Sequence, residues 1–422
     1  MPLVPYDQAS AWQRTTEWWQ QAGLGAFEGG GVPNLITNSR AAGRAAAALL
    51  ATRAPADGPV VVWEAGSGNG RWADQVFAAL EQDAGDRGKA LAKRLTIVIT
   101  ELSEGTIRET AGQPRIARRI AAGQLDIAVW DITSGQLPHL VSDGSDAPTP
   151  VAVFATYVAC CIPPKQIRHT SAGWFQLHTL EDEAGEPGRG FLGTAQWEDA
   201  DLDTLFDDGR HALVVKRTLE RLNSGTLVYP WRFAAFMDHL RGYAPEAMLV
   251  VNDVGACDEH LMLSSKDRMP QHYEGSMAHS VDFPWFDEWA QVFGGSVLRT
   301  GNPLRQVQTA VVLPEHHPDA NISAAFTRYV ASDTSLDDLA DFTEAAYAAL
   351  QGREIRTATR FYERCHQLDP DNTEFVLNIG QLCMAQGHMD RAIVWMQRGK
   401  ARDAHGEVDW DAHIAEVKRR QL

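Results

Sequence analysis

The stretch VVVWEAGSGNGRW at residues 60–72 decides the fold. Its apolar start is typical of a buried parallel strand, and the glycines at alternate positions allow a sharp turn that brings the backbone close to a ligand. The residues that follow have a helical pattern, so the free N–H groups at the start of a helix would face whatever lies over the turn. The stretch therefore predicts a strand, a ligand-binding turn and a helix within a parallel α/β sheet.

Two kinds of cofactor fit such a turn, and Arg71 separates them. A dinucleotide-binding turn needs glycine or alanine at this position, because the helix must pack closely on the strand. The spacing of Glu64, Gly66, Gly68 and Gly70 instead resembles motif I of the class I S-adenosylmethionine-dependent methyltransferases. The resemblance implies that these four residues bind S-adenosyl-L-methionine, with the loop around its methionine part. The alternative is a glycine-rich turn without a ligand.

Two further predicted strands end in acidic residues. Residues 95–103 (LTIVITELS) form a β-branched strand that reaches Glu101, whose carboxylate can accept hydrogen bonds from both hydroxyls of a ribose. Residues 125–132 (LDIAVWDI) form a shorter strand, where Trp130 could stack on an adenine ring and Asp131 could accept from its amino group. Each acid could also be an ordinary strand end.

The order of motifs between residues 5 and 313 resembles one branch of these enzymes, the MidA-like methyltransferases. This family includes the mitochondrial complex I assembly factor that acts as a protein arginine methyltransferase. The stretches that carry the resemblance are PNLITNSRAAGR (33–44), ELS (101–103), VFATYVACCIP (153–163), VVNDVG (250–255) and HSVDF (279–283). The resemblance implies a Rossmann-like sheet and a cofactor-binding role for Leu102 beside Glu101.

The fourth strand departs from the family pattern. Where the family usually has an Asn-Glu…Asp pattern before a proline, this chain has Thr156, Tyr157 and Cys160 before Pro163. A guanidinium is best held by carboxylates in bidentate geometry, so we expect an acceptor other than arginine. Tyr157 could orient an acceptor amine or hydroxyl, or the segment could simply fill the core.

The candidates for chemistry are Tyr157, Asp253 and His279. Methyl transfer depends mainly on positioning the acceptor in line with the methyl group, and it needs a base only if the acceptor must lose a proton. His279 could be that base or could orient Asp253, although a single histidine in a chain with 14 of them is more often structural.

Length, charge and cysteine content narrow the class of protein. The 422 residues suggest two or three domains, and 44% of them are hydrophobic, which is ample for globular folding. A net charge of −17 and a pI near 5.2 argue against nucleic acid or an anionic membrane as partner, because both need a basic surface. The chain lacks an apolar run of about 18 residues, a signal peptide and a metal-ligand spacing. We therefore expect a cytoplasmic protein without a metal.

The chain is expected to contain three parts. Residues 1–55 are predicted to be a helical N-terminal segment, and residues 56–313 an S-adenosylmethionine-dependent methyltransferase domain. Within the latter, residues 173–241 are predicted to be a cap insertion with helical character, at the sheet edge where ligands bind. Three N-terminal tryptophans are expected to pack near or cover the cofactor cleft: Trp12, Trp18 and Trp19.

Residues 330–422 have a different period. Small residues recur 34 positions apart at Ala358 and Ala392, and the pattern resembles two tetratricopeptide repeats with a polar closing helix at residues 408–421. Such a tail could recruit a peptide or partner subunit, build a homodimer, or only pack on the catalytic domain. We expect it to contribute nothing to cofactor binding.

Three classes of function agree with the sequence. The first is a methyltransferase for a peptide or protein side chain, with the tail for recruitment. The second is a methyltransferase for a small molecule, with the tail as a dimer module. The third is a non-catalytic assembly factor that retains the fold. The intact glycine motif and Glu101 favour an enzyme, and the tail favours a macromolecular partner.

Overall fold

The computed structural model describes most of the chain. The described residues are 3–27, 37–180, 195–222, 224–258, 262, 270–273, 275–305, 307–403, 406 and 408–421. Gln306, in the predicted closing strand, and residues 33–36 of the proposed family motif lie outside them. Among the described residues, no helix is long and apolar enough to cross a membrane.

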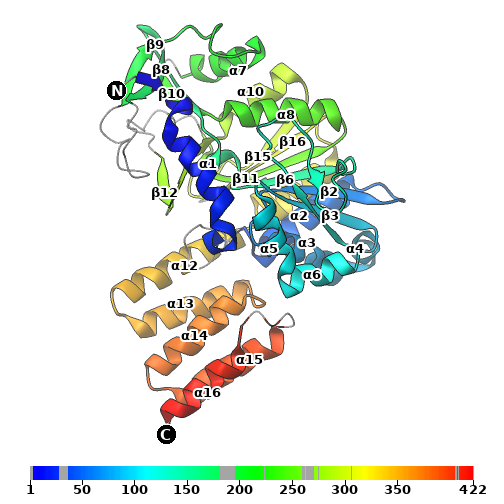
Figure 1. Ribbon diagram of the computed structural model, residues 1–422, viewed down its shortest axis with the longest axis vertical. Coiled ribbons are helices and arrows are strands. Elements are labelled where there is room, and N and C mark those ends of the chain that lie inside the picture. Colours follow the sequence, from blue (N-terminus) through cyan, green and yellow to red (C-terminus); the bar gives the residue numbers. More distant parts are fainter. Residues whose placement is uncertain are drawn as a thin grey trace.

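A nine-stranded mixed sheet forms the centre of the molecule (Figure 1). Its main order is β15 (Ser296–Arg299), β16 (Val307–Leu313), β11 (Met248–Ala256), β6 (Ala152–Thr156), β2 (Val60–Ala65), β3 (Leu95–Glu101), β4 (Leu125–Val129) and β5 (His139–Leu140), and β14 (Val281–Asp282) pairs with β11. Strands β4, β3, β2, β6 and β11 are parallel, whereas β16 runs antiparallel to β11. From β2 the chain builds the sheet outward in both directions, so a ligand crevice is expected at the carboxyl end of β2.

Helices cover both faces of this sheet. One apolar layer is built by α2 (Arg40–Arg53), α3 (Arg71–Gln82), α4 (Gly85–Ala92), α5 (Glu104–Gly112), α6 (Pro114–Ala121) and α11 (Ala320–Phe326). The other is built by α7 (Gly209–Glu220), α8 (Trp231–Tyr243) and α10 (Pro284–Phe293). The sheet therefore lies between two helical layers, as alternating strands and helices predict.

A second sheet accompanies α7 and α8 in the expected insertion, which is therefore only partly helical. It contains β1 (Leu3–Pro5), β8 (Gly173–Leu180), β7 (Lys165–Thr170) and β10 (Gly225–Tyr229), and β9 (Ala195–Asp199) pairs with β8. The β-branched and aromatic residues of β7 and β8, such as Ile167, Trp174 and Phe175, favour strands. The sheet begins before residue 173, and α8 belongs to the layer that covers the main sheet.

The N-terminal segment is not purely helical, because β1 pairs with β8 in this cap sheet. The turn η1 (Tyr6–Gln8) is held by a buried ion pair between Asp7 Oδ2 and Lys165 Nζ at 3.1 Å. The same oxygen accepts a hydrogen bond from Trp231 Nε1 at 3.0 Å. The chain start is thereby fixed to both the cap sheet and α8, and α1 (Ser10–Ala22) continues from it.

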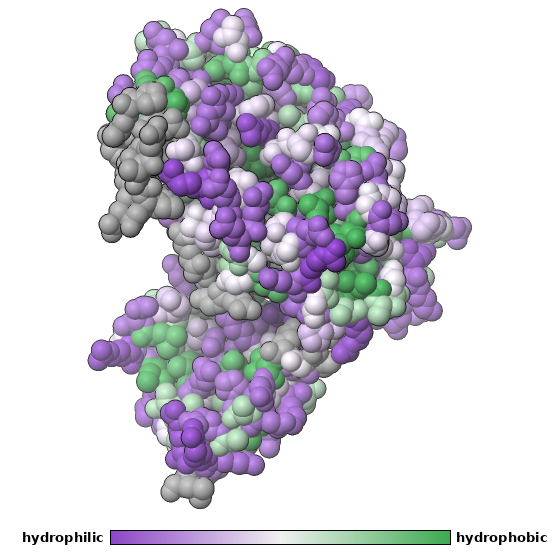
Figure 2. Space-filling view, in the orientation of Figure 1, coloured by the Kyte–Doolittle hydropathy of each residue, from purple (hydrophilic) through white to green (hydrophobic). Residues whose placement is uncertain are grey.

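The tail is a stack of antiparallel helices below the main body (Figure 1). After the turn η4 (Thr327–Ala331), these are α12 (Ser335–Gln351), α13 (Ile355–Leu368), α14 (Thr373–Ala385), α15 (Met389–Arg402) and α16 (Trp410–Gln421). Ala358 and Ala392 are fully buried, as their repeat positions predict. In Figure 2 the outline of the molecule narrows where the tail meets the main body, and hydrophilic side chains cover much of this face.

Gly399 allows the closing helix to pack against α15. A Cβ at Gly399 would lie 2.3 Å from the Trp410 ring, whereas a Cβ at Gly352, at the end of α12, would come no closer than 3.6 Å to its neighbours. We expect Gly399→Ala to destabilise the tail by about 1–3 kcal/mol through overpacking, and Gly352→Ala to be near neutral. Urea unfolding followed by circular dichroism measures both, and equal midpoints would contradict this packing.

Candidate functional site

A cavity of about 270 Å³ opens at the carboxyl ends of β2, β3, β4 and β6. This is the crevice that the strand order predicts. Seven of the eight sequence-predicted cofactor residues line it: Glu64, Gly66, Gly68, Glu101, Leu102, Trp130 and Asp131. Tyr157, a predicted catalytic residue, lines it as well. Residues far apart in the sequence therefore meet around one space large enough for a small organic ligand.

The glycine turn has the backbone that its sequence predicts. Gly66, Gly68 and Gly70 have φ angles of 65°, 56° and 69°, a region that residues with a Cβ rarely adopt. A Cβ at Gly68 would lie 2.9 Å from the Phe27 ring. Gly70 differs from the other two, because it precedes the first turn of α3 and faces Ile116 instead of the cavity. Its contribution is therefore to the shape of the turn.

Neighbouring elements hold the turn in place. Thr110 Oγ1 donates to the Gly68 carbonyl at 2.8 Å, and Gln113 Nε2 donates to the Asn69 carbonyl at 3.0 Å. Asn38 Nδ2 donates to Asn69 Oδ1 at 3.2 Å. Because these bonds satisfy the outer carbonyls, the turn keeps one shape with its inner side toward the cavity.

Two carboxyl groups, the buried Glu64 and the half-buried Glu101, stand beside each other under the turn. Glu101 Oε1 accepts a hydrogen bond from the Gly68 N–H at 2.5 Å, and burial raises the Glu101 pKa to about 7. Burial, with the neighbouring charge of Glu101, raises the Glu64 pKa well above its usual value. Glu64 Oε2 has no hydrogen-bond partner among the described residues, although it is buried. The pair would be stabilised by a ligand that brings positive charge or hydroxyl donors.

The part of the cavity next to the end of β4 is more apolar. Trp130 is 6% exposed, donates through Nε1 to the Gln136 carbonyl at 2.9 Å, and packs edge-on against Trp63. Asp131 Oδ1 accepts from the Thr133 N–H at 2.8 Å and from the Thr133 hydroxyl at 2.7 Å. The Asp131 carboxylate is therefore partly engaged in its own turn.

The other end of the cavity begins where β6 ends. Tyr157 has a φ of 56°, which is unusual for a residue with a bulky side chain, and such strain is often found at functional positions. Burial, then the charge of Asp253, raises the Tyr157 pKa, so its hydroxyl is a neutral donor. The remaining lining here includes Cys161, Arg232, Tyr273 and Ser276.

Asp253 and His279 do not line the cavity. Asp253 is fully buried, its Oδ2 accepts from the Cys160 N–H at 3.0 Å, and burial raises its pKa to about 7. His279 is 2% exposed. Its backbone N–H donates to the Cys160 carbonyl at 2.8 Å, and its ring atom Nε2 lies 2.6 Å from the Tyr6 hydroxyl. This placement does not favour direct acid–base roles for them. Both instead fix the turn η3 (Ala159–Cys161) that follows Tyr157.

The N-terminal helix forms a roof over the cavity. Thr16 and Trp19 of α1 line it, together with Phe27 at the end of η2 (Gly23–Phe27). Of the three tryptophans expected at the cleft, Trp19 therefore reaches the cavity. Trp12 packs instead on His279, with ring centroids 5.6 Å apart, and Trp18 covers the backbone at Gly275.

Several lining residues had no sequence signal. Tyr273 and Ser276 come from a short hairpin of β12 (Gln271–Tyr273) and β13 (Ser276–Ala278), and Arg232 comes from the first turn of α8. No motif contains them, and only long-range packing brings them to this place.

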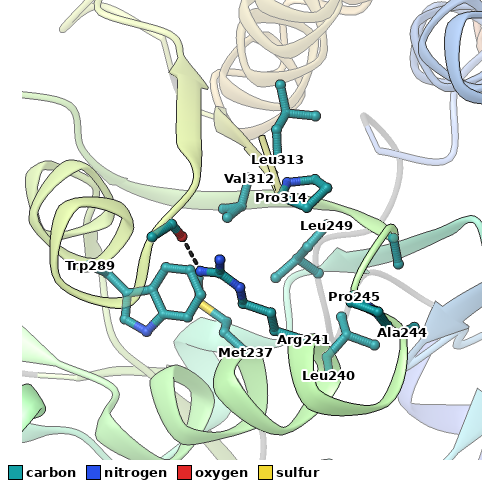
Figure 3. Close-up of a pocket in the computed structure, with 12 residues that line it drawn as sticks. Met237, Leu240, Arg241, Ala244, Pro245, Leu249, Trp289, Val312, Leu313 and Pro314 are labelled. Atoms are coloured by element: carbon teal, nitrogen blue, oxygen red, sulfur yellow. Dashed lines mark hydrogen bonds between the residues drawn. The ribbon is translucent and has the colours of Figure 1, made fainter. Parts of the chain in front are cut away.

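A second cavity, at the far end of α8, is too small for a substrate. Its volume is about 30 Å³, enough for roughly one water molecule. Figure 3 shows Arg241 crossing it, with Met237 and Trp289 around it. The Arg241 guanidinium donates to the carbonyls of Phe293 and Gly294, so it closes the end of α10.

Comparisons with known proteins agree with both parts of the chain. The tetratricopeptide repeat family matches residues 341–415. A solved structure of a candidate methyl transferase from Burkholderia thailandensis, bound to S-adenosyl-homocysteine, is 15% identical, with a TM-score of 0.52 over 77% of this chain and 91% of that one. An uncharacterized protein of the same superfamily and organism is 13% identical, with a TM-score of 0.47 over 76% and 90%. No curated protein matches the chain.

These similarities establish the fold. The chain has a Rossmann-like α/β sheet of the methyltransferase type and a C-terminal helical region of tetratricopeptide repeats. Both features were expected from the sequence and are confirmed.

The burial of Glu64 predicts a pH-dependent stability. Because its folded-state pKa is raised, its contribution is most favourable below the ordinary pKa of about 4.3 and is lost as pH rises through the folded value. Gln is neutral throughout, so Glu64→Gln should raise Tm at pH 8 and have little effect near pH 4. Scanning calorimetry at the two pH values measures this difference.

The matched control is Glu104→Gln, because Glu104 is exposed and pairs only with Arg108 on the same helix. It should leave Tm nearly unchanged at both pH values. An equal rise in Tm at pH 4 and pH 8 for Glu64→Gln would contradict the assignment of a destabilising buried charge to Glu64.

Proposed function

We propose that this protein is an S-adenosyl-L-methionine-dependent methyltransferase that acts on a peptide or protein side chain. The observation that carries the proposal is the pair of carboxyl groups, the buried Glu64 and the half-buried Glu101, beneath the glycine turn at the switch point of the sheet. The Burkholderia structure with S-adenosyl-homocysteine supports this choice of cofactor by likeness of fold.

The charge of the cavity supports a cationic cofactor. S-adenosylmethionine carries a sulfonium and an ammonium group, which two neighbouring carboxylates would stabilise. A dinucleotide would instead bring a pyrophosphate, and its negative charge would meet both carboxylates at the turn. Arg71 adds a second argument, because it occupies the position where a dinucleotide turn needs a small residue.

Each lining residue then has a defined task. When bound, S-adenosylmethionine supplies an electrophilic methyl group. The carboxylate of Glu101 accepts from the ribose hydroxyls, and Glu64 Oε2 accepts from a donor on the methionine side. Leu102 and Trp130 offer apolar contact to the adenine, with Asp131 beside them. These contacts position the cofactor for in-line transfer.

At the acceptor end, Tyr157 orients the acceptor through its neutral hydroxyl. Asp253 and His279 act on it indirectly, since both fasten the turn that follows Tyr157. Arg232 is the cation among the described lining residues here, and it would repel a guanidinium. This charge supports an acceptor other than arginine, in contrast to the arginine-modifying complex I assembly factor of the MidA-like family that the sequence resembles.

The tail supports a macromolecular partner, because tetratricopeptide repeats form surfaces for other polypeptides. In this proposal, residues 1–55 supply the roof, residues 56–313 bind the cofactor with a cap around residues 173–241, and residues 330–422 recruit the substrate or a partner subunit. A small-molecule acceptor, with the tail as a homodimer module, is the second candidate. The roof formed by Trp19 and Phe27 favours it, because it narrows the space for a large substrate.

The cofactor can be tested by calorimetry with S-adenosylhomocysteine and with NAD. We expect binding of the former, weakened by about 1.5–3 kcal/mol in Glu101→Ala through loss of charged hydrogen bonds, and unchanged in Glu104→Ala. Because the Glu101 pKa is about 7, affinity should rise between pH 6 and pH 8 as the carboxylate ionises. Binding of NAD without any response to S-adenosylhomocysteine would refute the proposed cofactor.

The acceptor can be tested by mass spectrometry of candidate partner proteins after incubation with isotopically labelled S-adenosylmethionine. We expect a gain of methyl mass on a side chain other than arginine, because Arg232 lines the same cavity as Tyr157 and β6 contains no carboxylate. Tyr157→Phe should slow transfer while leaving cofactor affinity intact. Dimethylarginine as the sole product would overturn the proposed acceptor.

A further inference from the structure

The main body and the tail meet through charges of opposite sign. Within the described chain, arginines of the body pair with aspartates of the tail and its leading turn: Arg40–Asp371 at 3.1 Å, Arg44–Asp333 at 3.9 Å, Arg71–Asp369 at 3.9 Å and Arg305–Asp337 at 3.2 Å. In each pair the body provides the cation. The tail is therefore fixed in orientation by electrostatic contacts as well as by packing.

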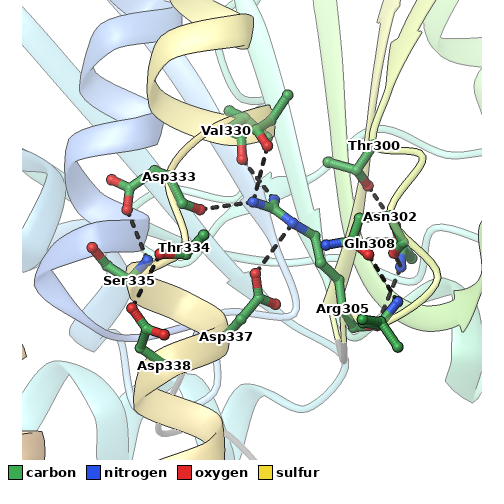
Figure 4. Close-up of polar contacts among 12 residues, drawn as sticks. Thr300, Asn302, Arg305, Gln308, Val330, Asp333, Thr334, Ser335, Asp337 and Asp338 are labelled. Atoms are coloured by element: carbon green, nitrogen blue, oxygen red, sulfur yellow. Dashed lines mark hydrogen bonds and ion pairs between the residues drawn. The ribbon is translucent and has the colours of Figure 1, made fainter.

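One of these contacts sets the start of the tail. Arg305 lies in the loop between β15 and β16, is 6% exposed, and donates to the carbonyls of Val330 at 2.6 Å and Asp333 at 2.7 Å (Figure 4). Its Nε also lies 3.2 Å from Asp337 in the first turn of α12. This anchor is distant in sequence from the glycine turn, and none of these residues lines the cavity.

Another contact reaches the glycine turn itself. Arg71 is the first residue of α3 and directly follows Gly70. Its N–H donates to Asn69 Oδ1 at 3.1 Å, so its backbone closes the turn. Its guanidinium lies 3.9 Å from Asp369, at the end of α13, whose side chain is 1% exposed. The tail thus holds the residue at which the cofactor turn becomes a helix.

The burial and the charges around Arg71 and Asp369 make the loss of either partner costly. Burial raises the Asp369 pKa, and the charge of Arg71 is the main influence that lowers it. On the other side, Arg115 of α6 is 7% exposed, and burial together with the charge of Arg71 lowers its pKa to about 10. Without the Asp369 carboxylate, less negative charge would offset the repulsion between the guanidinium groups of Arg71 and the buried Arg115. Removal of one partner from a buried ion pair is far more costly than removal of an exposed one.

We infer that Arg71 is a positioning residue for the cofactor turn and that Asp369 of the tail is its anchor, so that tail docking and cofactor binding are coupled. The inference rests on the proposed cofactor. It replaces the expectation that the tail contributes nothing to cofactor binding. By linkage, if docking at Asp369 favours the binding shape of the turn, bound cofactor must favour docking by the same factor.

The first test is a double-mutant cycle on the full chain, with affinity for S-adenosylhomocysteine measured by calorimetry. Arg71→Gln and Asp369→Asn should each weaken binding by about three- to tenfold, and the double variant should be no weaker than either single one. Asp369→Glu should restore part of the loss. Additive losses in the double variant would overturn the inference, because independent damage would then explain both.

Two controls separate this contact from general damage to the tail. Asp337→Asn removes the partner of Arg305, which is not part of the glycine turn, and Asp411→Asn removes an exposed pair with Lys400 inside the tail. Both should leave affinity within about twofold of the wild type. If Asp337→Asn weakens binding as much as Asp369→Asn, docking of the whole tail carries the coupling, and the specific role assigned to Asp369 and Arg71 is overturned.

A second test needs no substitution. Hydrogen exchange of the wild-type chain should slow in residues 366–376 when S-adenosylhomocysteine is added, while exchange in α16 should not change. Unchanged exchange in residues 366–376, with binding observed by calorimetry, would overturn the coupling but leave the proposed function standing. If S-adenosylhomocysteine does not bind the wild type at all, the proposed function fails and the coupling fails with it.

Discussion

The hydrogen bond from the Gly68 N–H to the Glu101 carboxylate is the contact on which the site depends. It joins the turn after β2 to the end of β3 at the point where the sheet order reverses. It also keeps a carboxylate buried beside Glu64, so folding brings together two groups that repel each other when ionised. The proximity of the two carboxylates costs free energy, and a ligand that supplies the missing donors would offset this cost. The cavity therefore favours cationic or hydroxyl-bearing ligands.

The elements around the glycine turn hold it in this position beside Glu101. Bonds from α5 and the start of α6 hold the outer carbonyls of the turn, and the N-terminal helix covers it from above. The helix is held in turn by the buried pair of Asp7 and Lys165, which ties the chain start to the cap sheet. The beginning of the chain and its middle therefore act together in covering the cavity over β2.

The sequence was sufficient for the parts that local rules determine. An apolar run with alternate glycines has few other solutions, so β2, the turn and α3 could be predicted, and so could the acids at the ends of β3 and β4. The 34-residue spacing likewise predicted the tail. Residues such as Tyr273 and Arg232 could not be found, because only the long-range packing of the cap brings them to the cavity. His279 shows the same limit, since its motif gave no sign that Tyr6 would enclose it.

The distribution of charge explains how a strongly acidic chain can carry both a cation-binding site and an appended tail. Acids concentrate inside the cavity, where a cationic ligand would meet them, whereas buried and half-buried arginines lie behind the glycine turn. Left uncovered, those arginines would repel one another next to the most sensitive part of the site. The aspartates of the tail neutralise them at the residue where the turn becomes a helix. The Arg71–Asp369 pair therefore links the C-terminal helical region directly to the first residue of α3.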